Sequence, residues 1–159
     1  MEIRYTPIGI IHSPFTDIEG MPIQPIGADG RMGRVEVFAE YAEGLKNLEG
    51  FSHIILLYHF HRSKGSRLLV TPFLDDEMRG VFATRAPRRP NAIGLSVVEL
   101  TEVVGNELQI KNVDVVNETP LLDIKPYIPE VDAHQVARVG WLEQVQDTMK
   151  RRKSDSRFR

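Results

Sequence analysis

The sequence predicts a mainly β protein, built as an antiparallel barrel or sandwich with only short helices. Apolar side chains follow a period of two or form short solid runs over most of the 159 residues, and turn-forming residues separate the runs about every ten residues. No long helical pattern lies between these runs. A chain of this length is large enough for a single domain with one buried core.

The strands are expected where apolar and polar residues alternate or where apolar residues follow one another. The run at 53–61 is solid enough to be buried on both faces over part of its length. Gly105 and Asn106 separate the last two runs and are typical of a tight hairpin turn. After residue 116 the chain turns through residues 117–120 and returns as a short extended segment. The expected strands are 3–12, 31–38, 53–61, 67–71, 80–84, 93–104 and 107–116.

Two segments carry helical patterns. Residues 40–47 have apolar residues at helical spacing and stop before Gly50. Residues 141–152 place Trp141, Leu142 and Val145 on one face, with acidic residues early and basic residues late, as the helix dipole favours. We therefore divide the chain into a barrel domain at 1–140 and a C-terminal helix with a basic tail at 141–159.

Residues 17–33 form the longest stretch without periodicity, and they are rich in glycine and proline. Long ordered loops in compact domains are usually functional, so we expect this loop to contribute to a site. Gly27, Gly30 and Gly33 superficially resemble a phosphate loop, but the flanking strand, helix and Lys-Ser/Thr pair are missing. No Gly-x-Gly motif lies in a βαβ setting, which argues against a Rossmann-type nucleotide site.

Composition excludes several classes of protein. The sequence has no cysteine, so it has no disulfide, zinc–thiolate site, iron–sulfur cluster or cysteine nucleophile. No apolar run approaches the roughly 20 residues that span a bilayer, and the first residues do not read as a signal peptide. We therefore expect a cytoplasmic protein without a membrane partner.

The formal net charge of −2 conceals an uneven distribution. Residues 150–159 contain six of the 20 lysines and arginines against one acidic residue, which leaves residues 1–149 with a balance of −7. An acidic body with a basic tail suggests a polyanionic partner. A solvated, frayed terminus is the alternative interpretation of the tail.

Histidines offer a possible metal site. His59 and His61 lie two apart in an expected strand, so they point to one face, and His53 has the same parity. Such a group could bind zinc or ferrous iron, and it leaves open a metal-dependent hydrolase or oxygenase. However, no carboxylate accompanies them on the strand, and we favour His61 as a hydrogen-bonding group in a cleft without metal.

The most informative stretch is 79–96, which places four arginines between residues 79 and 89 with no acidic residue among them. Pro87 and Pro90 stiffen this segment and favour a turn over helix or sheet. Planar cations on a rigid loop are suited to phosphate or carboxylate. The alternative is a solvated loop paired with the acidic residues at 75–77.

The extended segment after residue 120 carries three side chains that could move a proton. Asp123, Lys125 and Tyr127 alternate and therefore share one face. An acid, a base and a phenol side by side can act in general acid–base catalysis. A purely structural Asp–Lys pair capped by the tyrosine explains the spacing equally well.

Taken together, these segments resemble the TrmO family, also called TsaA-like: tRNA methyltransferases that use S-adenosylmethionine to methylate threonylcarbamoyl-adenosine beside the anticodon. The long stretches at 85–96 and 119–127 carry most of the resemblance, which runs to about residue 140. The matching stretches are 7–15, 24–25, 48–53, 60–62, 80–96 and 114–127.

The resemblance implies a small antiparallel β-barrel unlike other methyltransferases, a homodimer with the cofactor near the subunit interface, and tRNA, at its anticodon loop, as substrate. On physical grounds we expect Leu95 and Ile26 to flank the adenine of S-adenosylmethionine, Asp114 or Asn117 to meet ribose or amino protons, and Arg85 to meet the methionine carboxylate. The implied cofactor-binding residues are Gln24, Pro25, Ile26, His61, Arg62, Arg85, Leu95, Asp114, Val115, Val116 and Asn117.

The sequence departs from the family pattern beside the implied pocket. Ile26 stands where glycine is usual, Ala86 where serine is, Ala92 where proline is, and Asn117-Glu118 where Asp-Gly is. We expect the turn at Asn117-Glu118 to differ somewhat in shape. The additional C-terminal domain of bacterial relatives is absent from this sequence, which leaves the basic tail as a candidate for contact with tRNA.

The resemblance also suggests roles in the reaction. Methyl transfer from a sulfonium needs positioning and removal of a proton, and no metal. We hypothesise that Asp123 or Tyr127, with Lys125 beside them, accepts the proton of the acceptor nitrogen. Arg88, Arg89 and Asn91 would hold RNA phosphate or the threonyl carboxylate. A non-catalytic barrel that binds S-adenosylmethionine is the remaining alternative.

Overall fold

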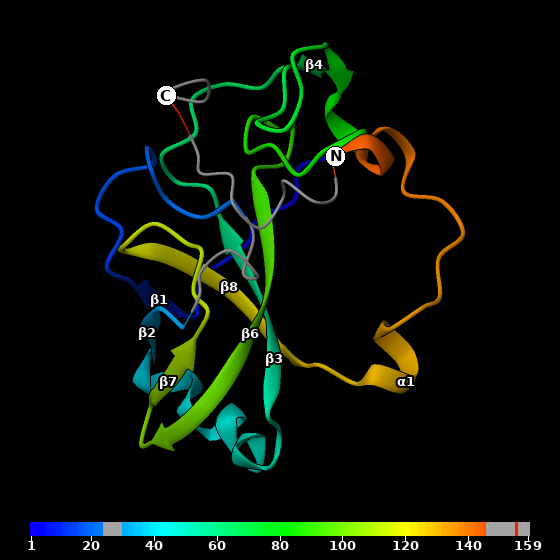
Figure 1. The fold of residues 1–159 in the computed structure, drawn as a ribbon. Coiled ribbons are helices and arrows are strands. Elements are labelled where there is room, and N and C mark those ends of the chain that lie inside the picture. Colours follow the sequence, from blue (N-terminus) through cyan, green and yellow to red (C-terminus); the bar gives the residue numbers. More distant parts are fainter. Residues whose placement is uncertain (24–29, 146–154, 156–159) are drawn as a thin grey trace.

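A closed barrel of six antiparallel strands forms the body of the protein (Figure 1). The computed structural model describes residues 1–23, 30–145 and 155. The strand order is β1-β2-β7-β6-β3-β8, and β8 pairs with β1 to close the barrel. The predicted antiparallel barrel is thus confirmed. Its strands are β1 (Gly9–His12), β2 (Met32–Val37), β3 (His53–His59), β6 (Ile93–Val104), β7 (Glu107–Lys111) and β8 (Thr119–Pro126).

The barrel interior is filled by aliphatic side chains from alternate positions of the strands. In β3, Ile54, Leu56 and Tyr58 are buried, whereas the intervening residues are half-buried or exposed. This alternation replaces the burial on both faces that the sequence suggested for part of β3. The aliphatic side chains of this core with no exposed area are Ile11, Val35, Ile54, Leu56, Val98, Leu108, Ile110, Val113 and Leu121.

A two-stranded sheet stands above one end of the barrel, within the long connection from β3 to β6 (Figure 1). It pairs β4 (Leu69–Val70) with β5 (Arg79–Gly80) and has its own small core around Val70 and Val81. The predicted strand at 80–84 is wrong after Gly80, because residues Val81–Ala83 form the 3-10 helix η4. Side-chain hydrogen bonds to the Val81 carbonyl, from Thr84 (2.9 Å) and Arg89 (3.1 Å), curl the chain at this point.

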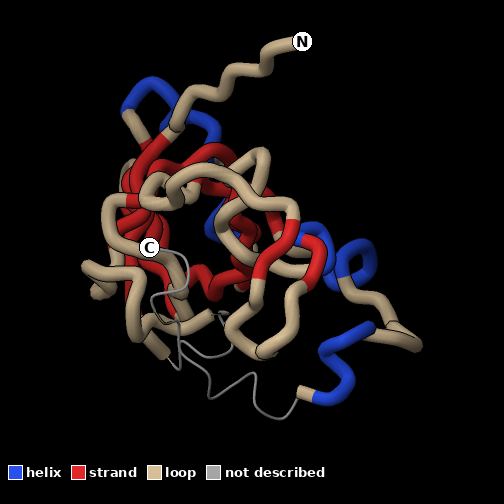
Figure 2. The backbone as a smooth tube through the Cα atoms, turned by 90° about the horizontal axis from the view of Figure 1, so that it is seen from above, coloured by secondary structure: helices blue, strands red, loops and turns tan. Residues whose placement is uncertain are grey.

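The helices are short and lie outside the barrel. Two 3-10 helices, η2 (Ala39–Leu45) and η3 (Leu48–Gly50), lie at the predicted first helix. After β8 the chain passes through α1 (Pro129–Asp132), away from the barrel, and returns to the end that carries β4 (Figure 1). There it forms the 3-10 helix η5 (Gly140–Gln144), and the remainder of the helix predicted at 141–152 lies outside the described residues apart from Val145. Viewed from above, the strands are grouped around the barrel axis and loops lie across this end of the barrel (Figure 2).

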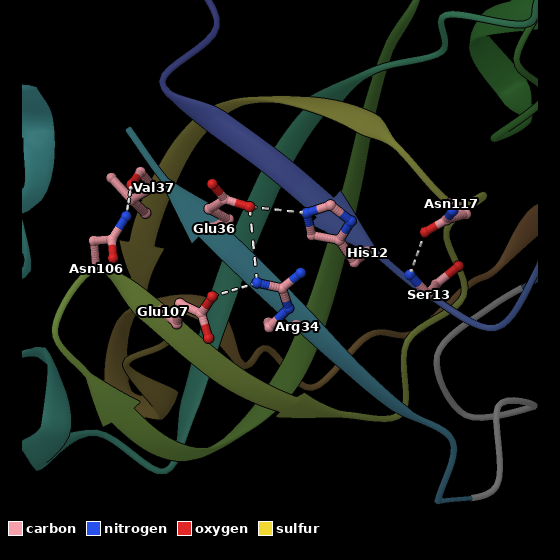
Figure 3. A network of polar contacts seen from close by, with 8 residues as sticks. All are labelled: His12, Ser13, Arg34, Glu36, Val37, Asn106, Glu107 and Asn117. Atoms are coloured by element: carbon pink, nitrogen blue, oxygen red, sulfur yellow. Dashed lines mark hydrogen bonds and ion pairs between the residues drawn. The ribbon is translucent and has the colours of Figure 1, made fainter. Parts of the chain in front are cut away.

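The hairpin between β6 and β7 follows the sequence prediction. Gly105 has a φ of 59°, which glycine adopts without steric cost, and Val104 pairs with Glu107 across the turn. The Asn106 side chain donates a hydrogen bond of 2.6 Å to the Val37 carbonyl, so the hairpin is tied to β2 (Figure 3).

In the part of the chain that the structure describes, no helix is long and apolar enough to cross a membrane.

We predict that Gly9→Ala weakens the barrel seam between β1 and β2. An alanine Cβ would lie 2.3 Å from the Glu36 carbonyl oxygen and 3.0 Å from the Val37 Cα, and both are backbone atoms that cannot move away. We expect the free energy of unfolding to fall by about 2 kcal/mol and the Tm to fall by roughly 5 °C. Urea and thermal unfolding measure this change. Gly44→Ala is the matched control, because nothing lies within 4 Å of its added Cβ, and an equal loss there would contradict the prediction.

Candidate functional site

A cleft of about 770 Å³ opens between the end of the barrel and the segment that carries β4 and β5. Its volume lies in the range of sites for small organic ligands and cofactors. The start of β6 forms one wall, where Ile93 and Leu95 turn apolar side chains outward and remain 36% and 46% exposed. Residues 82–87 and Trp141 also line the cleft, so elements that are distant in the sequence meet here.

The floor of the cleft contains a chain of hydrogen bonds that ends on a carboxyl group. Ser96 donates a hydrogen bond of 2.6 Å from its hydroxyl to Oδ1 of Asp114. Because the Ser96 proton is used there, the Tyr58 hydroxyl donates to Ser96 Oγ, at 2.9 Å. Burial raises the pKa of Tyr58 well above its usual value, so the phenol remains a donor. These hydrogen bonds join β3, β6 and the loop at 112–118.

Asp114 is the principal titratable group of the floor. Burial raises the pKa of its carboxyl to about 7, although the Ser96 hydroxyl and the more distant Arg85 guanidinium both lower it. A carboxyl with this pKa changes charge near neutral pH and favours a cationic or hydroxyl-bearing ligand beside it.

Gly94 allows the Tyr58 ring to lie against the backbone of β6. An added Cβ at Gly94 would lie 2.2 Å from the ring, and Gly94 itself lines the cleft. The edge of Tyr58 also meets Phe60 in a T-shaped contact, with ring centroids 5.6 Å apart. The ring that carries the first hydroxyl of the chain is therefore held on two sides.

His61 lies in the cleft as a neutral hydrogen-bonding group. Thr119 donates its hydroxyl proton to the Val116 carbonyl at 2.7 Å, so the 3.3 Å contact between Thr119 Oγ1 and His61 Nδ1 requires the imidazole to donate. Burial lowers the pKa of His61, and Arg62 lowers it further. The Nε2 atom consequently has its lone pair available as an acceptor.

The sequence suggested that the three histidines share one face of a strand. The structure shows that they do not. β3 ends at His59, and His61 lies in the turn beyond it. His53 contacts the Ser52 hydroxyl at 3.0 Å and His59 contacts the Ala92 carbonyl at 3.2 Å. Among the described residues, no group of three or more histidines, aspartates and glutamates could hold a metal ion.

The four arginines of 79–89 have different surroundings. Arg79 pairs with Asp75 and Glu77 at 2.7 and 2.9 Å, as the solvated-loop alternative predicted for this loop. The Arg89 Nη1 atom donates to the carbonyls of Val81, Thr84 and Ala86, so this side chain orders the turn before it. Arg85 is exposed and lines the cleft, whereas Arg88 is half-buried.

Asn117 and Ser13 fasten the loop that carries Asp114. Asn117 Oδ1 accepts a hydrogen bond of 3.0 Å from the Ser13 backbone (Figure 3), and the Ser13 hydroxyl donates to the Val115 carbonyl at 2.5 Å. Glu118 follows with a φ of 62°, the left-handed conformation that favours glycine. The turn therefore has a glycine-type backbone although glutamate occupies it, and this is a source of local strain.

Asp123, Lys125 and Tyr127 do not line this cleft. A register shift in the pairing of β3 with β8, at Leu57 and Tyr58, changes which side chains face inward, so Ile124 packs on the core. Asp123 and Lys125 form an ion pair of 2.8 Å on the outer surface, and the hydrogen bond to Asp123 raises the pKa of Lys125. Asp123 instead borders a second hollow, of about 600 Å³, next to η2 and η3.

The cleft thus gathers most of the described residues that the family resemblance implied for the cofactor. Asn117 fastens the loop, and Arg88 and Asn91 lie outside the lining of the cleft. Gln24, Pro25 and Ile26 lie outside the described residues. The gathered residues are His61, Arg62, Arg85, Leu95, Asp114, Val115 and Val116, together with Arg89.

Sequence reasoning missed several residues of the cleft. Tyr58 lines the cleft and the buried Ser96 supports it, and the sequence pattern predicts no role for either, although a phenol in an otherwise apolar run needs a buried partner. Trp141 was assigned to a helix face, whereas its indole N–H donates to the Ala83 carbonyl at 2.8 Å and the ring lines the cleft. That the sequence contains a single tryptophan was the one signal available.

Comparison with known proteins gives consistent results. The sequence profile of the tRNA-methyltransferase O N-terminal domain matches residues 10–133. A probable S-adenosyl-L-methionine-binding protein of Pyrococcus abyssi is 56% identical over 98% of this chain and 85% of its own length. The tRNA (adenine(37)-N6)-methyltransferase of Escherichia coli is 39% identical over 79% of this chain.

A crystal structure of TrmO from Pseudomonas aeruginosa has the same fold, with a TM-score of 0.75 and 38% sequence identity over 89% of this chain. The chain spans 63% of that protein and 58% of the E. coli relative. The similarity therefore covers nearly all of this chain but only part of the longer relatives.

We predict that Asp114 makes the stability of the fold depend on pH. Its pKa in the folded state, about 7, lies above the ordinary 3.8, so between these values the folded protein retains a proton that the unfolded chain has released. Stability contributed by this group is therefore lost as pH rises from about 4 to about 7, and it stays low above pH 7.

Asp114→Asn removes the ionisation and keeps an acceptor for Ser96. As pH rises from 4 to 8, the free energy of unfolding of the variant should increase by roughly 2–4 kcal/mol relative to that of the original protein. Urea unfolding across this pH range measures the difference between the two curves. If the two curves of unfolding free energy against pH run parallel, the fold does not disfavour the ionised form of Asp114, and the prediction is wrong.

Proposed function

Because the chain belongs to the TrmO family, we propose that it is an S-adenosylmethionine-dependent methyltransferase that acts on the 6-amino nitrogen of adenosine 37 in tRNA. The observation that carries the proposal is the cleft, which brings His61, Arg85, Leu95 and Asp114 together from four separate segments. We propose that the acceptor is threonylcarbamoyl-adenosine. The tRNA substrate and the cysteine-free composition support a cytoplasmic location.

The residues of the cleft fit S-adenosylmethionine. Leu95 and Ile93 offer an apolar wall for adenine, and Arg85 offers a partner for the amino-acid carboxylate. Buried Asp114 suits a cationic or hydroxyl-bearing group. Among the described residues, the buried Ser63 hydroxyl at the cleft also has no hydrogen-bond partner, so a polar ligand atom there would satisfy it.

When bound, the cofactor would supply the methyl group of its sulfonium. The rest of the cofactor would leave as a neutral thioether. Asp114 would shift towards its ionised form beside a cation, because an opposite charge lowers the pKa of a carboxyl. Ser96 and Tyr58 hold that carboxyl in one position, and Asn117 and Ser13 hold its loop. Neutral His61 would accept a hydrogen bond at Nε2 without adding positive charge near the sulfonium.

We propose that a second copy of the chain provides the acceptor side of the site. Asp123, Lys125 and Tyr127 lie away from the cleft of their own chain, so they could reach a substrate only in the cleft of a partner. Exposed apolar side chains on the β4–β5 segment support a covering partner: Leu68, Leu69 and Met78 are 67%, 56% and 63% exposed. We therefore propose a homodimer with the cofactor near the interface, in which Asp123 or Tyr127, beside Lys125, accepts the proton of the acceptor nitrogen.

The arginines divide the remaining roles. Arg89 orders the turn at 81–86 through three carbonyls, and this places Arg85 in the cleft. Arg88 and exposed Asn91 border this turn and would meet RNA phosphate or the threonyl carboxylate. The loop thus combines a structural arginine with arginines that meet anions.

We predict that the protein transfers a radiolabelled methyl group from S-adenosylmethionine to tRNA that carries threonylcarbamoyl-adenosine and not to tRNA that lacks it. Arg85→Ala should lower kcat/KM by roughly 10² because a charge-assisted contact with the cofactor is lost. Calorimetric binding of S-adenosylmethionine without methyl transfer to either tRNA would contradict the proposal and favour a non-catalytic binding protein.

We predict that two inactive variants complement each other. Arg85→Ala damages the cleft, and the double variant Asp123→Asn, Tyr127→Phe damages the acceptor side. If the site is shared between subunits, mixed dimers contain one intact site, and an equimolar refolded mixture should recover about a quarter of the original activity. Full turnover by the double variant alone would refute the proton acceptors, and a mixture as inactive as its components would refute the shared site.

A further inference from the structure

Trp141 closes one side of the cleft from a segment beyond the matched family domain, which ends at residue 133. The chain leaves the barrel through α1 and returns, so that η5 lies beside the β4–β5 segment (Figure 1). The Trp141 Nε1 atom donates to the Ala83 carbonyl at 2.8 Å, which fixes the edge of the indole on η4. The ring is half-buried and lines the cleft.

A guanidinium that is already engaged supports this indole. The Arg79 guanidinium carbon lies 5.8 Å from the centre of the Trp141 ring. Asp75 and Glu77 both pair with Arg79, at 2.7 and 2.9 Å. Its charge is thus compensated, and its role here is to hold the ring by a cation–π contact.

Phe82, on the same short helix η4 as Ala83, also has an arginine against its ring. Its side chain is 75% exposed and lines the cleft. The Arg89 guanidinium carbon lies 5.9 Å from the centre of the ring, and Arg89 is held by the carbonyls of Val81 and Thr84. Both aromatic rings therefore rest on arginines that the protein itself has immobilised.

We propose that Phe82 and Trp141 form a nucleobase-stacking site at the rim of the cleft, which receives the base at position 37 of the RNA acceptor. Rings held in place before binding offer π-faces to an unstacked base at little entropic cost. The Phe82 side chain is 75% exposed in the lining of the cleft, so its ring is accessible to such a base. The inference rests on the proposed function, since it identifies where the RNA substrate of that function binds.

Charge around the rim favours RNA over the adenine of the cofactor as the source of the base. Asp114 is hydrogen-bonded to Ser96 in the barrel wall, whereas Phe82 lies on η4, outside the barrel strands, and is 75% exposed. Lys64 and Arg67 are exposed in the segment that follows Ser63, another residue of the cleft lining. Phosphates on either side of an inserted base would meet these cations.

Fluorescence tests the site directly because Trp141 is the only tryptophan in the sequence. A synthetic anticodon stem-loop RNA with adenosine at position 37 should quench the emission, since a stacked base quenches indole. The same stem-loop with an abasic position 37 should bind with little quenching. Equal quenching by both RNAs would overturn the proposal, and so would strong quenching by S-adenosylmethionine alone, because that result would assign the rings to the cofactor.

Variants provide the second test. Trp141→Leu and Phe82→Leu should each raise the KM for tRNA by roughly 10-fold, whereas Trp141→Phe, which keeps a ring, should retain most of the affinity. Binding of S-adenosylmethionine, measured by calorimetry, should change by less than about 2-fold. Tyr5→Leu is the control, because this tyrosine is 65% exposed and lines neither hollow. An equal loss of cofactor and RNA affinity would indicate a purely structural role and overturn the inference.

The two proposals fail separately. Quenching by the stem-loop without methylation of modified tRNA would contradict the proposed function and leave the stacking site standing. Methylation with an unchanged KM in Trp141→Leu would contradict the stacking site alone.

Discussion

The hydrogen bond from Ser96 to Asp114 is the interaction on which the candidate site depends. It joins the wall of the barrel to the loop at 112–118, and Tyr58 extends it to β3. A carboxyl is costly to bury, and its raised pKa is the sign of that cost. The rest of the fold offsets the cost through an interior of aliphatic side chains and a barrel without open edges.

A second principle of the site is that rigid supports position it. The Arg89 side chain binds carbonyls of the turn at 81–86, Ser13 and Asn117 fasten the loop of Asp114, and Gly94 admits the Tyr58 ring. None of these residues needs to touch a ligand to matter, because each fixes the backbone or ring that does. A preformed site of this kind loses little entropy when it binds a ligand.

The proposed dimer would bring together two parts of the site that are separate in one chain. These are the cleft on one side and Asp123, Lys125 and Tyr127 on the other. One copy of the barrel provides a pocket with a polar floor, whereas the ion pair on β8 and the phenol of Tyr127 directly after it lie outside the lining of that pocket. A shared site would join the two in one assembly, as isologous dimers can. Trp141 and Phe82 would then receive the RNA at the rim, so cofactor and acceptor would approach from different sides.

Patterns and motifs in the sequence were enough to predict the strand-rich barrel, the β6–β7 hairpin and most of the residues of the cleft. Alternation and turn chemistry are local signals, and the family motifs at 85–96 and 119–127 are long. Only the tertiary structure showed that Val81–Ala83 curls into a 3-10 helix, that β3 ends before His61, and that a register shift turns Ile124 inward. Side-chain bonds and strand register decide these features, and they are not local in sequence. The same holds for Trp141, whose partner lies 58 residues away, because packing across the fold gave it a place beside the cleft.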